Sequence, residues 1–184
     1  MTLRLVRPSL ERLPGYAAAL EAGWSPDTTR DVSAEQLAAL RDDPLAFLDD
    51  LVRQDGTIED AAGEIHPRLP SFVFWLDDGE FCGAINLRFV RGSDDLPSHV
   101  SGHVGYAVVP WKRRRGYATK ALSMLLPIAW EAGLSRIEIV CGDDNEASRR
   151  VILANGGAAI GSRQSEGATK LVFGIKFSDA KARI

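Results

Sequence analysis

The residues most able to do chemistry gather in the stretch VVPWKRRRGYATK, which spans residues 108–120. An apolar strand ends there, a basic turn with a glycine follows, and a helix begins. Cations just before a helix N-terminus oppose the helix macrodipole by about 0.3–1 kcal/mol each, so helix formation alone does not explain them. An anion at the helix start would explain them, because free amide groups, the dipole and the arginines would all point at a phosphate.

The glycine and alanine of this stretch favour the phosphate interpretation. Gly116 lets the main chain approach a ligand closely, and Ala118 keeps the first helical turn thin. The alternative is that a Lys-Arg run forms a solvated face or a nucleic-acid patch. The common nucleotide loops are excluded, because neither the Walker A pattern nor G-x-G-x-x-G is present.

Composition narrows the classes of partner. The chain has 184 residues, a formal charge of −3 and 45% hydrophobic residues. This balance is that of an ordinary globular domain, which excludes intrinsic disorder and gives no global field to recruit nucleic acid. The most apolar segment, residues 122–130, is too short to span a bilayer, which takes about 20 residues. The first residues lack a signal-peptide pattern, so we expect a cytoplasmic protein without a membrane partner.

Cysteine and histidine usage argues against a metal site. Cys82 and Cys141 each lie in an apolar, strand-like run, which favours reduced core thiols over a disulfide. The three histidines have neither an i,i+4 companion nor a C-x-x-C neighbour (His66, His99 and His103). We therefore expect no metal to be bound.

The order of predicted elements indicates one α/β domain with a mixed sheet, spanning residues 1–184. Helices come first, then an antiparallel meander, then strands alternating with helices. Strands are predicted at 3–6, 71–76, 80–90, 103–109, 136–141, 158–161 and 171–177; helices at 9–21, 33–41, 45–52, 117–132 and 146–154. Ser33 to Gln36 reads as a capping box, Asp43 as an N-cap before Pro44, and residues 56–70 as a loop.

The pattern Arg113-x-x-Gly116-x-Ala118, after a strand ending Val108-Val109-Pro110, resembles the R/Q-x-x-G-x-G/A motif of the GCN5-related N-acetyltransferases (GNAT). The segment Asp144 to Ser148, followed by Gly156-Gly157, resembles the second half of that family's cofactor site. Together the resemblance covers about residues 71–177. It implies a single GNAT-like domain whose mixed, mostly antiparallel sheet contains a splayed central pair of parallel strands, residues 103–109 and 136–141, flanked by helices.

The resemblance implies acetyl-CoA as cosubstrate, bound between the two splayed strands. The backbone of Val108 and Val109 would hold the pantetheine arm, and one of their N–H groups would polarise the thioester carbonyl. Asn145 and Ser148 would contact the arm from the other side, although Asn145 also fits a plain helix N-cap. The pyrophosphate loop carried over from the family consists of Arg113, Arg114, Arg115, Gly116, Tyr117, Ala118 and Thr119.

The reaction implied is direct attack of a primary amine, on a small molecule or a protein N-terminus, within a ternary complex. Many members carry a Tyr acid seven residues after the Asn, where this chain has Ile152, so the acid is unassigned and solvent or Ser148 could serve. His103 is the leading candidate base, although a lone strand His is often structural. Glu138 is a weaker candidate, and Cys141 has no neighbour in sequence to activate it as a nucleophile.

The acceptor is the least defined part of the sequence. Asn86 and Arg88 share the less apolar face of their strand, where the Arg could hold a substrate carboxylate or lie on a solvated face. Because Ile152 replaces the usual Tyr, a second hypothesis stays open: the protein is a non-catalytic acyl-CoA-binding module. The resemblance also makes a homodimer plausible.

Overall fold

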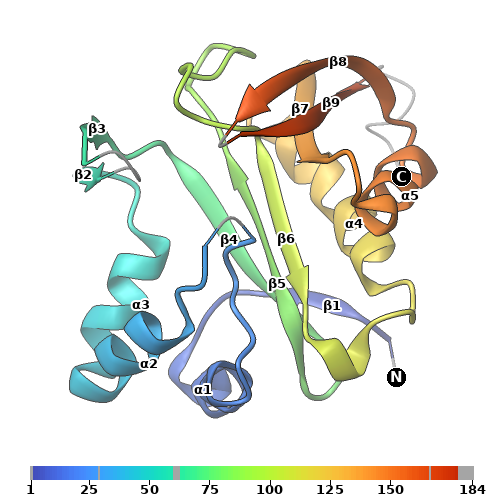
Figure 1. The fold of residues 1–184 in the computed structure, drawn as a ribbon. Helices are drawn as coiled ribbons and strands as arrows, with labels where there is room; N and C mark the ends of the chain where they lie inside the picture. The colour runs from blue at the N-terminus through green and yellow to red at the C-terminus, as the bar shows by residue number, and fades with distance from the viewer. Residues whose placement is uncertain (1, 29, 60–62, 166, 178–184) are drawn as a thin grey trace.

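Two main antiparallel sheets, a separate two-stranded ribbon (β2-β3) and the helices that cover the sheets form the described part of the chain (Figure 1). The computed structural model describes residues 2–28, 30–59, 63–165 and 167–177. The strands are β1 (Arg4–Val6), β2 (Thr57–Glu59), β3 (Ile65–Pro67), β4 (Ser71–Asp77), β5 (Phe81–Arg88), β6 (Val104–Val108), β7 (Arg136–Gly142), β8 (Ala158–Ser165) and β9 (Ala168–Lys176). The α-helices are α1 (Leu13–Glu21), α2 (Ser33–Asp42), α3 (Pro44–Val52), α4 (Tyr117–Glu131) and α5 (Glu146–Ala154), with 3₁₀ turns η1 (Leu10–Arg12) and η2 (Pro110–Lys112).

The larger sheet has the order β1-β4-β5-β6 and the smaller one β7-β9-β8, so β6 and β7 are edge strands of different sheets. A backbone hydrogen bond joins them, from the His103 amide to the Glu138 carbonyl at 2.8 Å, just before β6 begins. The expected single mixed sheet is therefore divided at this point. No parallel ladder joins β6 to β7 within the described residues, so the splayed parallel pair stays a prediction.

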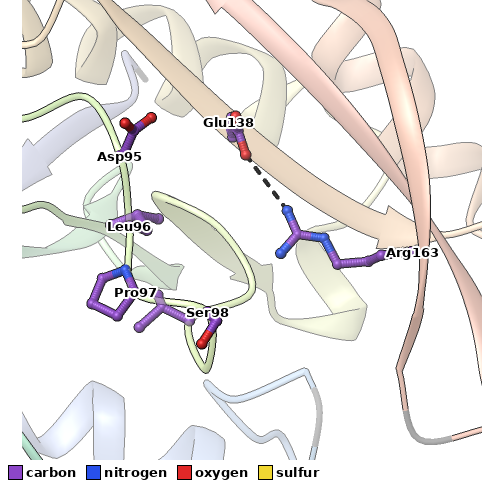
Figure 2. A pocket seen from close by; sticks show the side chains of 7 residues that line it. Asp95, Leu96, Pro97, Ser98, Glu138 and Arg163 are labelled. Atoms are coloured by element: carbon purple, nitrogen blue, oxygen red, sulfur yellow. Dashed lines mark hydrogen bonds and ion pairs between the residues drawn. The ribbon is translucent and has the colours of Figure 1, made fainter.

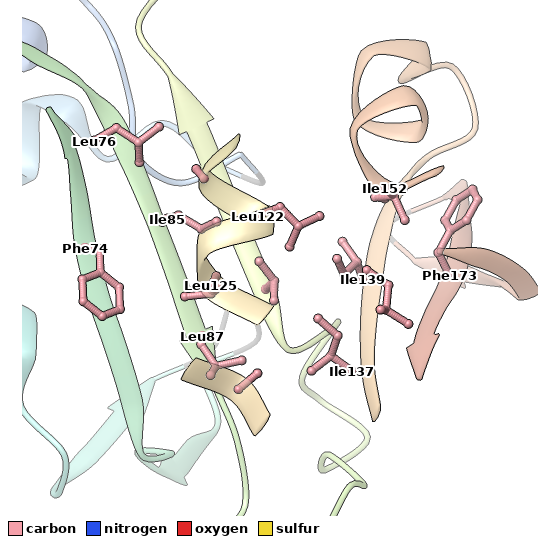
Figure 3. Packing of buried hydrophobic residues seen from close by; sticks show 14 of the residues in the cluster. Phe74, Leu76, Ile85, Leu87, Leu122, Leu125, Ile137, Ile139, Ile152 and Phe173 are labelled. Atoms are coloured by element: carbon pink, nitrogen blue, oxygen red, sulfur yellow. The ribbon is translucent and has the colours of Figure 1, made fainter. Parts of the chain in front are cut away.

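Helix α4 packs against both sheets and makes the main core. Leu122 and Leu125 are fully buried, and Figure 3 shows them between Ile85 on β5 and Ile137 on β7. Burial of each leucine contributes about 1.5–3 kcal/mol relative to exposure, and because α4 contacts both sheets this burial favours their association. The edges β6 and β7 are thus held near one another by apolar packing rather than by a shared ladder.

The opposite face of the larger sheet is covered by α1, α2 and α3. Tyr16, Trp24 and Trp75 lie in this second core, where the rings of Tyr16 and Trp75 stack at 4.8 Å. Ala84 and Ala107, paired across β5 and β6, pack here, whereas their chain neighbours Ile85 and Tyr106 pack on the α4 side. Alternation along a strand therefore assigns each residue of β5 and β6 to one face or the other.

The structure tests the two helix caps and the long loop that the sequence predicts in the N-terminal half. The Asp43 carboxylate accepts from the amides of Leu45 and Ala46, which confirms the predicted N-cap before Pro44. The capping box at Ser33 is wrong, because the Asp31 carboxylate accepts the Ser33 amide and α2 already begins at Ser33. The predicted loop at 56–70 contains the β2–β3 ribbon, although its residues 60–62 lie outside the described residues.

Both cysteines are free and buried, as the sequence predicts. Within the described ranges, no helix has the length and apolar character needed to cross a membrane.

Candidate functional site

The outer edge of β6 presents unpaired backbone groups toward β7. The Val109 amide donates to the Cys82 carbonyl at 3.0 Å, so it is used inside the sheet. Hydrogen bonding alternates along an antiparallel strand, and the amides of Val108 and Tyr106 therefore point to the other edge. Of the two amides predicted to polarise a thioester, the one at Val108 faces the space between the sheets.

The basic turn leads from β6 into α4 with an open helix N-terminus. Gly116 is the N-cap in the left-handed region, with φ 74°, and no side chain caps the helix. Arg114 also has a positive φ of 61°, an uncommon conformation for a side-chain-bearing residue. The first turn contains no acidic residue, so the amides of Tyr117, Ala118 and Thr119 lack the side-chain acceptor that usually satisfies them.

The three arginines before the helix are exposed. The Arg113 Nε donates to the Val108 carbonyl at 3.1 Å, which ties the turn to the end of β6. Three exposed arginines thus directly precede a helix N-terminus with free amides and a positive dipole end, and this combination suits an anion.

Lys112 does not join the arginines. It is buried, and its ammonium bonds Asp78 at 3.1 Å and Glu80 at 2.7 Å. The Tyr117 hydroxyl donates to the same Asp78 carboxylate at 2.5 Å. Burial alone would raise the pKa of Asp78, but hydrogen bonds from Tyr117 and Lys112 hold it well below its usual value. This ion cluster fastens both ends of the basic turn to the β4–β5 hairpin.

Asn145 and Ser148 lie at the start of α5. The Asn145 side chain accepts from the Ser148 amide at 3.0 Å. Asn145 is thus a helix N-cap, the alternative that the sequence analysis gives beside contact with the pantetheine arm. The Ser148 hydroxyl lies 2.7 Å from the hydroxyl of Tyr106, a residue of β6. Burial raises the pKa of Tyr106 to about 12, so this hydroxyl stays protonated at neutral pH.

Sequence reasoning missed Tyr106. Side chains alternate between the two faces along β6, so Tyr106 shares a face with Val104 and Val108. This alternation could have predicted that Tyr106 faces α4 and α5 rather than α1. The hydroxyl pair of Tyr106 and Ser148 spans from one sheet to the helix after β7. The Cys141 thiol lies in the same region, and burial raises its pKa, which makes it a poor nucleophile.

His103 is 1% exposed and holds β6 to β7. Its Nδ1 accepts from the Glu138 amide at 3.0 Å, while its Nε2 is buried without a partner. A neutral ring that accepts at Nδ1 carries its hydrogen at Nε2, so no lone pair is free to take a substrate proton. Burial lowers the pKa of His103, which keeps the ring neutral.

Glu138 lines a cavity of about 240 Å³ between β7, β8 and the loop of residues 94–100. Figure 2 shows its carboxylate facing Arg163, at 3.5 Å, with Asp95 and Ser98 on the loop side. Glu138 alternates with the buried Ile137 and Ile139, so it lies on the face turned away from α4. The loop is fixed by Asp94, which accepts from the Ser135 amide at 2.7 Å.

Ile152, at the position of the usual family Tyr, is fully buried in the α4 core and labelled in Figure 3. It therefore presents no polar group to the space between the sheets. Within the described residues, no group of three or more His, Cys, Asp or Glu lies close enough to hold a metal ion.

Comparison with known proteins decides the family. The sequence model described as the acetyltransferase (GNAT) family matches residues 27–156. The chain belongs to this family. The GNAT resemblance inferred from the basic turn is thereby confirmed. A curated relative, the uncharacterized N-acetyltransferase YoaA of Bacillus subtilis (strain 168), is 39% identical over 81 residues, 44% of this chain and 43% of that protein. The match thus spans less than half of either protein.

Solved structures share the GNAT fold across nearly the whole chain. The microcin C7 self-immunity acetyltransferase MccE, in complex with acetyl-CoA and AMP, has a TM-score of 0.63 and 12% identity, covering 95% of this chain and 92% of that one. RimL, a ribosomal L7/L12 alpha-N-protein acetyltransferase in complex with coenzyme A, has a TM-score of 0.62 and 16% identity, covering 99% and 96%. A putative GNAT-family acetyltransferase from Bordetella pertussis has a TM-score of 0.57 and 20% identity, covering 94% of each chain.

Proposed function

We propose that the protein is an acetyl-CoA-dependent N-acetyltransferase that acts on a primary amine in a ternary complex. The observation that carries the proposal is the β6-to-α4 junction, where an unpaired strand edge runs into an uncapped helix N-terminus with three exposed arginines. MccE and RimL, which share the fold, have acetyl-CoA or coenzyme A bound in their structures.

The residues present fit acetyl-CoA. The Val108 amide points out of the β6 edge, where an extended pantetheine arm could add like a strand. The amides of residues 114–119 and the exposed arginines would hold the pyrophosphate, and Gly116 leaves open space where a side chain would stand. The bound cosubstrate supplies an activated acetyl thioester, whose carbonyl the Val108 amide would polarise.

Two proton tasks remain for the chain. Ser148 would protonate the departing thiolate, with the Tyr106 hydroxyl behind it as a hydrogen-bond partner. Glu138 would receive the ammonium proton of the acceptor through intervening water, because it lines the cavity on the face away from α4 and lies opposite His103 rather than Val108. The base role predicted for His103 is replaced by a positioning role, since its two hydrogen bonds fix the Glu138 backbone.

The acceptor would be a small-molecule amine or a protein N-terminus. One solved structure with this fold is of an acetyltransferase that modifies the N-terminal serine of the 50S ribosomal subunit protein L7/L12 from Salmonella typhimurium. The competing function is an acyl-CoA-binding module without catalysis, which the buried Ile152 favours because it removes the usual acid.

One assay separates the two functions. Purified protein is incubated with acetyl-CoA and panels of amines and N-terminal peptides, and free coenzyme A thiol is measured. Amine-dependent thiol release is expected of the enzyme. Tight acetyl-CoA binding without thiol release for any amine would instead support the binding module.

A further inference from the structure

Arg88 is the last residue of β5, and its side chain lies over β6. A Cβ atom built on Gly105 would stand 3.3 Å from an Arg88 guanidinium nitrogen and 2.9 Å from the Asn86 Oδ1. The missing side chain at Gly105 therefore makes room for both polar groups. Asn86 itself is fixed there, because its Oδ1 accepts from the Gly105 amide at 2.9 Å.

Arg88 lies on the face of the sheet covered by α1 to α3, where Ala84 and Ala107 pack. Two and four residues along β5 from Ala84, this face becomes polar, with Asn86 and then Arg88. Among the described residues, no carboxylate oxygen comes within 4.0 Å of the Arg88 guanidinium. Burial lowers the pKa of Arg88, and the charge of Asp27 only partly opposes this effect. A partly buried cation without an ion-pair partner costs free energy that an anionic ligand would recover.

Arg88 and the proposed base, Glu138, lie on either side of His103 across three neighbouring chain segments. The Arg88 amide donates to the His103 carbonyl at 2.8 Å, and the His103 amide donates to the Glu138 carbonyl at 2.8 Å. Two strand spacings separate the backbones of Arg88 and Glu138 by roughly 10 Å. A cation and a carboxylate thus flank the point where β6 and β7 part, on the side away from α4.

We propose that the acceptor amine carries a carboxylate a few bonds away and that Arg88, positioned by Asn86 and Gly105, binds this carboxylate. The inference rests on the proposed acetyltransferase function. Glu138 then faces the ammonium end of the same acceptor. A guanidinium suits this task because its fork donates two parallel hydrogen bonds to a carboxylate.

Two sources supply this chemistry, a free amino acid or a peptide whose N-terminal residue is Asp or Glu. The assay therefore uses matched pairs that differ in one charge. Free amino acids are compared with their carboxamides, and amidated peptides beginning with Asp or Glu with those beginning with Asn or Gln. Thiol release gives kcat/KM for each acceptor with the wild type, Arg88→Gln, Arg88→Lys and Arg91→Gln.

The wild type is expected to prefer one of the acids over its carboxamide by about 10- to 100-fold. Arg88→Gln should bring that ratio close to 1, with Arg88→Lys in between because it keeps the charge and loses the fork. Arg91→Gln removes the same charge from an exposed position and should leave the ratio at its wild-type value. An acid-to-amide ratio that is the same in wild type and Arg88→Gln overturns the proposal.

A binding arm separates this inference from the proposed function. N-acetyl amino acids and their carboxamides are titrated calorimetrically into the protein with coenzyme A, and the melting temperature of each variant checks its folding. Carboxylate binding that Arg88→Gln weakens at least tenfold supports the Arg88 site even if no amine releases thiol, an outcome that defeats only the acetyltransferase function. If no carboxylate binds, or if Arg88→Gln binds the carboxylates as tightly as the wild type does, the proposal fails.

Discussion

At the scale of single residues, the hydrogen bonds of His103 favour Glu138 over His103 as the base, the reverse of the order that the sequence suggests. The His103 ring has one nitrogen bonded to the Glu138 amide and the other buried. The sequence places a titratable group near the start of β6, but it says nothing of the lone pairs. Only the position of the neighbouring strand determines that this histidine fixes Glu138.

Replacing His103 tests the positioning role. Asn can supply a side-chain oxygen to the Glu138 amide, so His103→Asn should keep most of the activity, whereas His103→Ala should lower kcat/KM at least tenfold by leaving that amide unpaired. The pH–rate profile should be the same in wild type and His103→Asn. A loss of activity in both variants together with a changed profile would restore His103 as the base.

The same residue makes stability depend on pH. Its folded pKa lies below its unfolded value of about 6.5, so its contribution is complete above that pH and is lost as the pH falls toward the folded pKa. Chemical denaturation between pH 5 and pH 8 should show this loss in the wild type and a weaker pH dependence in His103→Asn.

Ser148 and Tyr106 carry a second residue-scale prediction. Removing the proposed proton donor with Ser148→Ala should lower kcat by about 10²-fold or more while changing acetyl-CoA affinity little. Tyr106→Phe should lower kcat less, because Ser148 keeps its own hydroxyl. Steady-state kinetics alongside calorimetry measures both quantities; an unaltered kcat in Ser148→Ala would leave solvent as the acid.

At the scale of elements, the turn between β6 and α4 depends on an anchor outside itself. Lys112 and Tyr117 lie at its two ends and both bond Asp78 on the β4–β5 hairpin. The order strand, basic turn, helix was evident from the sequence. The different positions of the four cations were not evident, since nothing in the sequence KRRR distinguishes the buried Lys112 from the three exposed arginines.

Substituting Asp78 tests this anchor. Asp78→Asn should destabilise the fold by about 1–3 kcal/mol at neutral pH and weaken acetyl-CoA binding, because a buried ammonium loses its paired charge. Glu80→Gln is the matched control on the same lysine; Glu80 is exposed, and its loss should cost at most about 1 kcal/mol. Since the pKa of Asp78 is lowered, its contribution is present above pH 4 and is lost on acidification, so Asp78→Asn should lack that part of acid unfolding. Equal effects of the two substitutions would contradict the anchor.

At the scale of the whole molecule, local sequence signals predicted most elements and left their assembly open. Periodicity located α4 and α5, and Asp43-Pro44 located the start of α3. The division into two sheets depends on long-range contacts such as His103 with Glu138, which have no local signature. The proposed roles of Tyr106 and Arg88 also depend on long-range packing, because each role follows from the residues that the side chain contacts in another element.

The proposed function depends above all on pyrophosphate binding at the N-terminus of α4. Gly116→Glu places a carboxylate at that point, and Gly133→Glu is a matched control near the C-terminal end of the same helix. Both glycines have positive φ and open space around a built Cβ, so the two substitutions carry similar backbone strain.

Calorimetric titration of acetyl-CoA into the wild type and these two variants is the most direct test. The wild type and Gly133→Glu should bind acetyl-CoA with similar affinity, whereas the affinity of Gly116→Glu should fall at least a hundredfold while its melting temperature stays close to that of Gly133→Glu. Equal affinity in all three proteins would show that the phosphates bind elsewhere and would contradict the assignment of this helix N-terminus.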